Sequence, residues 1–121
     1  MSLFLLLLAA EIALPRQLLP KTASEQTSKA ADAYWTCVLT KSAHFEKSHE
    51  SPDVIARTAK TSCQFEQTEF LILLDVDFSE VSQTVSDASP ETPVSISNSF
   101  EDRLTAEAEK LVVEARARAA Q

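Results

Sequence analysis

The chain has 121 residues, which is room for one small domain, and it contains no glycine. Glycine supplies the positive-φ positions of tight hairpins and phosphate-binding loops, so its absence disfavours an all-β fold, excludes a P-loop or dinucleotide-binding fingerprint, and with abundant alanine favours an all-α fold. The formal net charge is -7, without the basic face that nucleic-acid binders use, so no nucleic-acid partner is expected.

Residues 1–23 have the pattern of a secretory signal peptide followed by a short linker. Leu3 to Ala10 form an unbroken apolar run, which suits the hydrophobic core of a signal peptide and is shorter than the about 20 residues of a bilayer span. No Lys or Arg precedes the run, and cleavage after Ala10 would place Leu8 at the -3 position. We expect an exported protein, periplasmic or secreted, without a membrane span in the mature chain. The alternatives are an apolar first helix packed on the domain and a wrongly assigned start codon.

Residues 24–85 are predicted to form an antiparallel helical hairpin. Neither Gly nor Pro occurs between residues 24 and 47, and the apolar residues there fall mainly at helical spacing. Ser51, Pro52 and Asp53 then have the pattern of a new helix, with a capping serine, a proline in the first turn and an acid near the positive end of the helix dipole. Two helices are therefore expected to meet at a turn just before Ser51.

Cys37 and Cys63 are predicted to form a disulfide that staples this hairpin. An even number of cysteines downstream of a signal-like segment is typical of a disulfide. Two antiparallel helices folded about residue 50 pair positions whose numbers add to about 100, as those of the two cysteines do. The same rule places Tyr34 beside Glu66, and if the carboxylate of Glu66 is buried, the Tyr34 hydroxyl is the expected donor to it. The alternative is two buried free thiols in a cytosolic protein.

The segment HFEKSHESPD, residues 44–53, combines histidines and acids, but we interpret it as the turn between the two helices. His44 and His49 are five residues apart, whereas two ligands on one helix face are three or four apart. Together with Cys37 and Cys63 the two histidines have the composition of a zinc site, but the close pair of cysteines that is usual in such sites is missing. No metal site and no cofactor is predicted.

The remaining candidate sites also lack a required residue. Asp75, Asp77 and Ser79 begin like a calcium loop, but Glu80 stands where glycine is needed and Ser86 where a bidentate glutamate is needed. No glycine-flanked serine occurs and no spacing selects a catalytic triad, so no catalytic residue is predicted and an enzyme is not expected. The apolar run at residues 70–74 fits either a continuing helix, with a kink near Asp75, or a buried strand, and the lack of breakers favours the helix.

Residues 86–99 read as a Pro/Ser-rich loop, and residues 100–121 as a C-terminal amphipathic helix. Asn98 and Glu101 have the form of a capping box at the helix start, with Ser99 as the competing cap. This helix is expected to pack on the hairpin, with pairing to another chain as the alternative. The apolar stripe that would make either contact consists of Phe100, Leu104, Ala108, Leu111, Val112 and Ala115.

Between Thr61 and Asp102 the chain has nine acids and no Lys or Arg. This pattern indicates a solvated acidic face, or a docking surface for a basic partner or a divalent cation. The favoured function is a small exported helical protein that is not an enzyme, and that binds another protein or has a structural role in the cell envelope. The acidic segment or the C-terminal helix would make the contact, and no oligomeric state is predicted.

Two alternative functions stay open. Trp35 to Cys37, the tripeptide WTC, is similar to one found in the small helical HdeA-like periplasmic chaperones, which also carry one disulfide. The resemblance implies an acid-stress holdase that unfolds in acid and binds clients, but the cysteines here are closer together than in that family. The other alternative is a metal-binding protein or enzyme using His44, His49 and the acidic segment.

Overall fold

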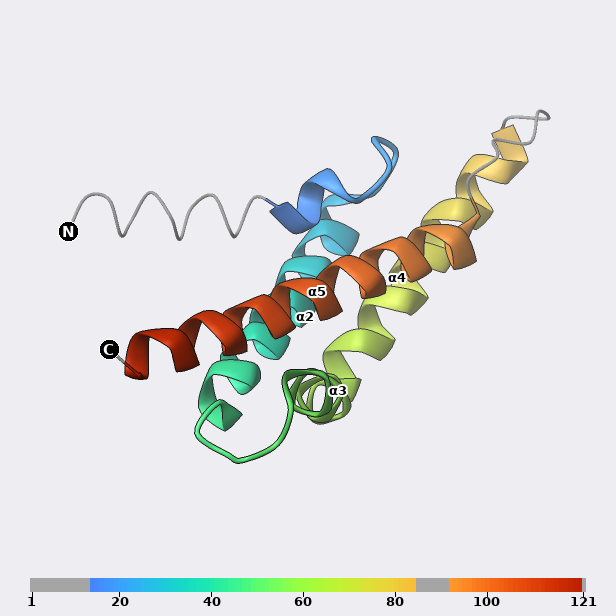
Figure 1. Cartoon of the computed structure of the whole chain (residues 1–121). Helices are drawn as coiled ribbons and strands as arrows, with labels where there is room; N and C mark the ends of the chain where they lie inside the picture. Colours follow the sequence, from blue (N-terminus) through green and yellow to red (C-terminus); the bar gives the residue numbers. More distant parts are fainter. Residues whose placement is uncertain (1–13, 85–91, 121) are drawn as a thin grey trace.

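The computed structural model describes residues 14–84 and 92–120, with the side chains of residues 80–84 left out (Figure 1). The described residues contain no strand, so the all-α prediction is confirmed and the run at residues 70–74 is helical. None of the described helices has the length and hydropathy needed to cross a membrane. After a helical turn at residues 14–17, the helices are α2 (Glu25–Phe45), α3 (Pro52–Ser62), α4 (Gln64–Thr84) and α5 (Pro93–Ala119).

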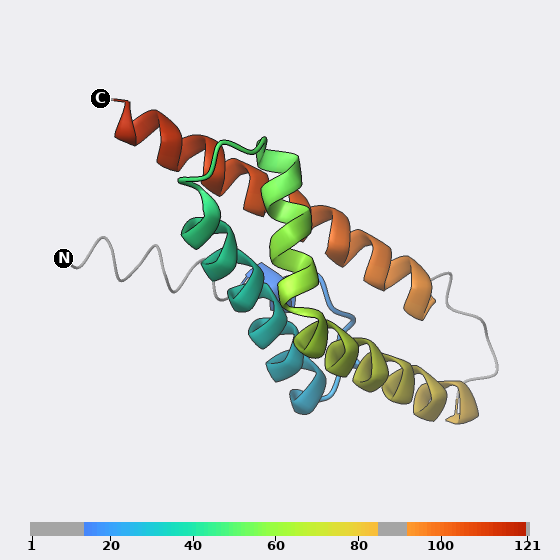
Figure 2. The same ribbon diagram turned by 90° about the horizontal axis from the view of Figure 1, so that it is seen from below.

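Each of these four helices contacts the other three, and α2 is the central element because its contacts with them are the most extensive. Figures 1 and 2 show that α3 and α4 meet at an angle, and that α5 runs the length of the bundle. The predicted hairpin therefore has α2 as one arm and the bent pair α3 and α4 as the other. The predicted disulfide joins the arms, with Cys37 on α2 and Cys63 at the junction of α3 and α4.

The bend in the second arm lies at Cys63. Helix α4 then continues as one helix from Gln64 to Thr84, so the predicted kink near Asp75 is wrong. Cys63 has a non-helical backbone, with φ -106° and ψ 26°, and α4 begins at the next residue. Just before it, the hydroxyls of Thr61 and Ser62 donate to carbonyl oxygens one turn back, at 3.1 Å and 3.0 Å. Hydroxyls that bond back to the helix in this way weaken and often bend it, which gives a local reason for the break.

Helix α5 starts at Pro93, so the predicted loop is wrong for residues 93–99 and the predicted cap at Asn98 lies inside the helix. Thr92 and Ser95 form the capping box instead: the Thr92 hydroxyl accepts from the Ser95 N–H at 3.0 Å, and the Ser95 hydroxyl accepts from the Thr92 N–H at 2.9 Å. Proline is well tolerated at the first helical position, where its missing N–H would have no partner. The extra turns also bury Ile96.

Residues 1–13 and 85–91 lie outside the described residues, and with them the predicted apolar signal run and residues 86–91 of the predicted Pro/Ser-rich loop. The core of the described part is an aromatic cluster around Phe100 of α5. Its ring lies 4.6 Å from that of Phe70, 6.1 Å from that of Tyr34 and 5.5 Å, edge-on, from that of Trp35, measured between centroids. These contacts join α2, α4 and α5, and the rings bury large apolar areas in stacked, tilted and edge-on pairs.

Candidate functional site

Three large apolar side chains are exposed along one face of α4: Phe65 is 78% exposed, Ile72 58% and Val76 47%. At about 100° per residue, Ile72 and Val76 lie within about 20° of Phe65 around the helix axis, over a length of about 16 Å. The opposite face of the helix is fixed in the core, where Phe70 is 0% exposed and Leu74 1%. We call Phe65, Ile72 and Val76 the α4 stripe.

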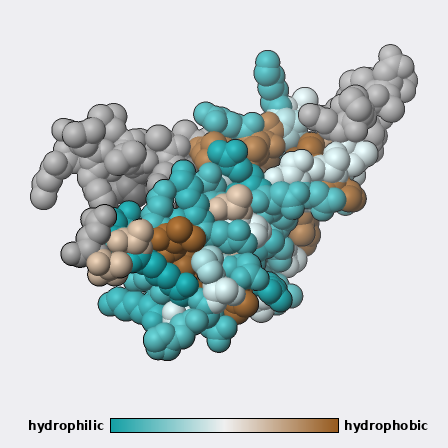
Figure 3. All heavy atoms as spheres, in the orientation of Figure 1, coloured by the Kyte–Doolittle hydropathy of each residue, from teal (hydrophilic) through white to brown (hydrophobic). Residues whose placement is uncertain are grey.

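Acidic side chains flank the α4 stripe on both sides. By the same helical geometry, Glu66 and Glu69 lie on one side of it and Asp75 lies on the other. Helix α4 contains no Lys or Arg, and no ion pair within the described residues involves any of these three carboxylates. Figure 3 shows small brown patches of apolar surface at several places among the hydrophilic teal, including the right-hand edge, where α4 lies.

The half-buried carboxylate of Glu101, on α5, is the densest polar centre of the bundle. It accepts from the Tyr34 hydroxyl at 2.8 Å, from Gln67 Nε2 at 2.8 Å and from Lys60 Nζ at 2.6 Å. The donors come from α2, α4 and α3, so this one side chain links all four helices. Burial, reinforced by the hydrogen bond to Glu101, raises the pKa of Tyr34, which therefore stays a neutral donor.

This Glu101 cluster (Tyr34, Lys60, Gln67 and Glu101) corrects the predicted Tyr34–Glu66 bond. The Tyr34 hydroxyl bonds across the bundle to α5, because the bend at Cys63 changes the course of α4. Each oxygen and nitrogen described above has a partner within the cluster, so the carboxylate is not a free base and the lysine is not a free acid. The arrangement suits a structural tie better than acid–base catalysis.

A surface hollow of about 320 Å³ lies beside this cluster, lined by Arg57, Lys60, Thr61, Gln64 and Gln67. Its two cations are already compensated, since Lys60 pairs with Glu101 and Arg57 pairs with Asp53 at 3.5 Å. The pKa of Asp53 is lowered, chiefly by the Ser51 hydroxyl and further by the backbone N–H groups at the start of α3. The hollow therefore has little excess charge to attract an anion.

Cys37 and Cys63 form a disulfide with a Cα–Cα distance of 6.0 Å. The carboxylate of Glu66 lies within 4.8 Å of both sulfur atoms, and the three residues form a group with metal-ligand composition. Metals bind thiolate sulfur, and neither sulfur is a thiolate while the disulfide is formed. His44 and His49 are both exposed, and neither belongs to this group.

Asp77 caps α2 and has no role in a calcium loop, since residues 75–84 are helical. Its buried carboxylate accepts from the Ser24 N–H at 2.9 Å and from the Thr27 hydroxyl at 2.6 Å. These donors lie at the N-terminus of α2, where the helix dipole favours a negative charge. The sequence indicated this role only through the helical spacing that places Asp77 on the buried side of α4, with Phe70 and Leu74.

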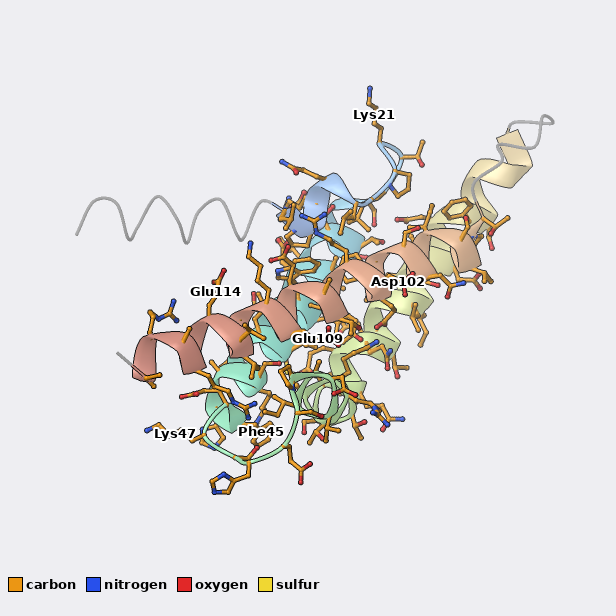
Figure 4. The ribbon with its side chains drawn as sticks, in the orientation of Figure 1. Lys21, Phe45, Lys47, Asp102, Glu109 and Glu114 are labelled. Atoms are coloured by element: carbon orange, nitrogen blue, oxygen red, sulfur yellow. A yellow bond between two sulfur atoms is a disulfide. The ribbon has the colours of Figure 1, made fainter. Side chains whose placement is uncertain are left out.

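Arg116 of α5 holds the turn that connects α2 and α3. Its guanidinium donates to the carbonyl oxygens of Glu46 at 3.1 Å, Ser48 at 2.7 Å and Glu50 at 2.6 Å. Figure 4 shows Phe45 and Lys47 at this end of the bundle, below the C-terminal half of α5. The segment read from the sequence as a turn is therefore a turn, and a cation from the far end of the chain satisfies its backbone.

We expect Arg116→Ala to loosen this turn and to lower the free energy of unfolding by about 1–2 kcal/mol, because three carbonyl oxygens lose a charged donor while water replaces part of the loss. Amide hydrogen exchange at residues 46–51 should become faster, with little change in α4. Arg118→Ala is the matched control, since Arg118 is exposed on the same helix turn. Equal effects of the two substitutions would contradict a specific role of Arg116.

Comparisons with protein-family models, with curated proteins and with solved structures gave no match. The similarity of Trp35 to Cys37 to the HdeA-like chaperones stays a resemblance of three residues. The function of this chain is therefore argued from the geometry of the described residues.

Proposed function

We propose that this protein binds a partner protein through the α4 stripe and is not an enzyme. The exposed apolar row of Phe65, Ile72 and Val76 carries the proposal. Single apolar residues are common on protein surfaces, but several on one helix face are typical of a contact surface. The binding energy would come from burying these side chains, of which the aromatic ring of Phe65 is the largest.

The position of the α4 stripe supports this proposal, because the stripe is held on a firmly anchored helix. Phe70 and Leu74 fix the opposite face of α4 in the core, and the disulfide at Cys63 fixes its N-terminal end. A surface that is ordered before binding loses less conformational entropy when the partner arrives. The described polar centres, by contrast, are engaged in structural contacts, which favours binding over catalysis.

We further propose that the protein works in an oxidising compartment, periplasmic or secreted. The disulfide supports this location, since such bonds persist mainly outside the cytosol. The apolar run from Leu3 to Ala10 supports it independently through its resemblance to a signal peptide.

Site-specific photo-crosslinking in the cells that produce the protein tests the binding function. A photoreactive amino acid at position 72 should give discrete adducts, and the same amino acid at position 113 should not. Val113 is a suitable control because it is 54% exposed and lies on α5. Adding Phe65→Ser should remove the adducts from position 72. The same adducts from both positions, or none from position 72, would contradict the proposal.

A further inference from the structure

We infer that the partner presents a basic amphipathic helix, whose apolar face covers the α4 stripe and whose Lys or Arg side chains meet Glu69 and Asp75. This inference rests on the proposed function and adds the chemistry of the partner. It combines the linear apolar row with the carboxylates that flank it.

The shape of the surface favours a helix over an extended segment. The α4 stripe spans three turns, with its members seven and four residues apart, which is the spacing at which helices present anchors to one another. A partner strand would need free backbone N–H and C=O groups along an edge, and those of α4 are used within the helix. Side chains alone are therefore available for contact, as in helix–helix packing.

The charges favour a basic partner. The exposed Glu69 lies on one side of the α4 stripe and the exposed Asp75 on the other, and no Lys or Arg within the described residues pairs with them. Cations at the edges of an approaching helix would gain Coulomb energy on both sides, while their aliphatic stems extend the apolar contact. Complementary charge of this kind also speeds association and selects against other partners.

The same charges disfavour two other occupants. A second copy of this chain packed through its own α4 would bring identical carboxylates together, and like charges at a helix interface are destabilising. An anionic lipid surface would be repelled, since membrane-binding helices carry Lys and Arg on their polar face. Both occupants become outcomes of the test.

The test titrates the intact, oxidised chain with three fluorescent helical peptides that share one leucine face and differ only in their flanking residues: Lys, Gln or Glu. Fluorescence anisotropy should show that the Lys peptide binds at least tenfold more tightly than the Glu peptide. Added salt should narrow this difference in affinity between the two peptides.

The double variant Phe65→Ser/Ile72→Ser should weaken binding of the Lys peptide at least tenfold, whereas Val113→Ser should leave the affinity for this peptide unchanged. The double variant Glu69→Gln/Asp75→Asn should weaken binding of the Lys peptide alone.

Each other outcome overturns a defined part of the account. Equal binding of the three peptides, lost in Phe65→Ser/Ile72→Ser, would refute the basic partner and leave the proposed function standing. Binding of the Lys peptide that survives this double variant would show attraction to net charge alone and refute the inference. If no peptide binds, two further experiments look for another occupant of the α4 stripe. A dimer in sedimentation experiments, or binding to vesicles containing phosphatidylglycerol, would refute the inference if it is lost in Phe65→Ser/Ile72→Ser. If no peptide, dimer or vesicle binding is found, the proposed function also fails.

Discussion

Removing the disulfide is expected to lower the free energy of unfolding by about 3.5 kcal/mol, which is the chain-entropy value for a loop of this length. Cys37 and Cys63 are 26 residues apart in sequence, and the bond joins α2 to the junction of α3 and α4. Without it the unfolded chain gains conformational freedom, and the buried side chain of Cys63 loses packing in the native state as well. A loss of this size is a large share of the stability of a small domain.

The variant Cys37→Ala/Cys63→Ala, unfolded by heat and by urea, measures this effect. Its melting temperature should fall by roughly 10–25 °C, since each kcal/mol is worth about 4–8 °C for domains of 60–100 residues and about 2–4 °C for domains of 150–250 residues. A dithiol reductant should lower the melting temperature of the unmodified protein to a similar extent and leave the double variant unaffected, which controls for other effects of the reductant. Unchanged stability of the double variant would contradict a stapling role.

The substitution Glu101→Ala is expected to lower the free energy of unfolding by about 2–4 kcal/mol. Removing one member of a buried ion pair costs about 3–5 kcal/mol, and the value here is reduced because Glu101 and Lys60 keep side-chain exposures of 17% and 25%. The Tyr34 hydroxyl, on a side chain that is 0% exposed, also loses its acceptor. Equilibrium urea unfolding measures the change.

Asp102→Ala is the matched control, because this neighbouring acid is exposed on α5 and its loss should change stability by less than about 0.5 kcal/mol. A double-mutant cycle gives the second check. In a Tyr34→Phe background Glu101→Ala should cost less, since no hydroxyl is left without a partner. If Glu101→Ala costs no more than Asp102→Ala, the cluster does not tie the helices together.

The sequence was sufficient to predict the helical class, the turn near residue 50 and the disulfide, because each depends on local signals. Ser51 and Pro52 mark the start of a helix, and the symmetry of Cys37 and Cys63 about the turn follows from antiparallel packing. The bend at Cys63 was missed because periodicity continues across it. The start of α5 was missed because Pro93 was read as a helix breaker, although it is equally suited to the first turn of a helix.

The contacts that define the polar centres could not be predicted, because they join residues far apart in the chain. Tyr34 was assigned to Glu66 by the symmetry of the hairpin, whereas its acceptor is Glu101 of α5, whose position depends on the whole bundle. The acidic character of the segment around α4 was evident in the sequence. Which apolar residues of α4 remain exposed was less evident, because the run at residues 70–74 is apolar on every side of the helix.

Amide NMR of the intact, oxidised protein, titrated with the lysine-flanked helical peptide, tests the central claim of binding through α4 most directly. The largest chemical-shift changes should fall between Phe65 and Val76 and should be absent in Phe65→Ser/Ile72→Ser, while the C-terminal half of α5 stays unchanged. Changes centred on α5, or on the hollow lined by Arg57 and Lys60, would contradict the claim that the α4 stripe is the binding surface.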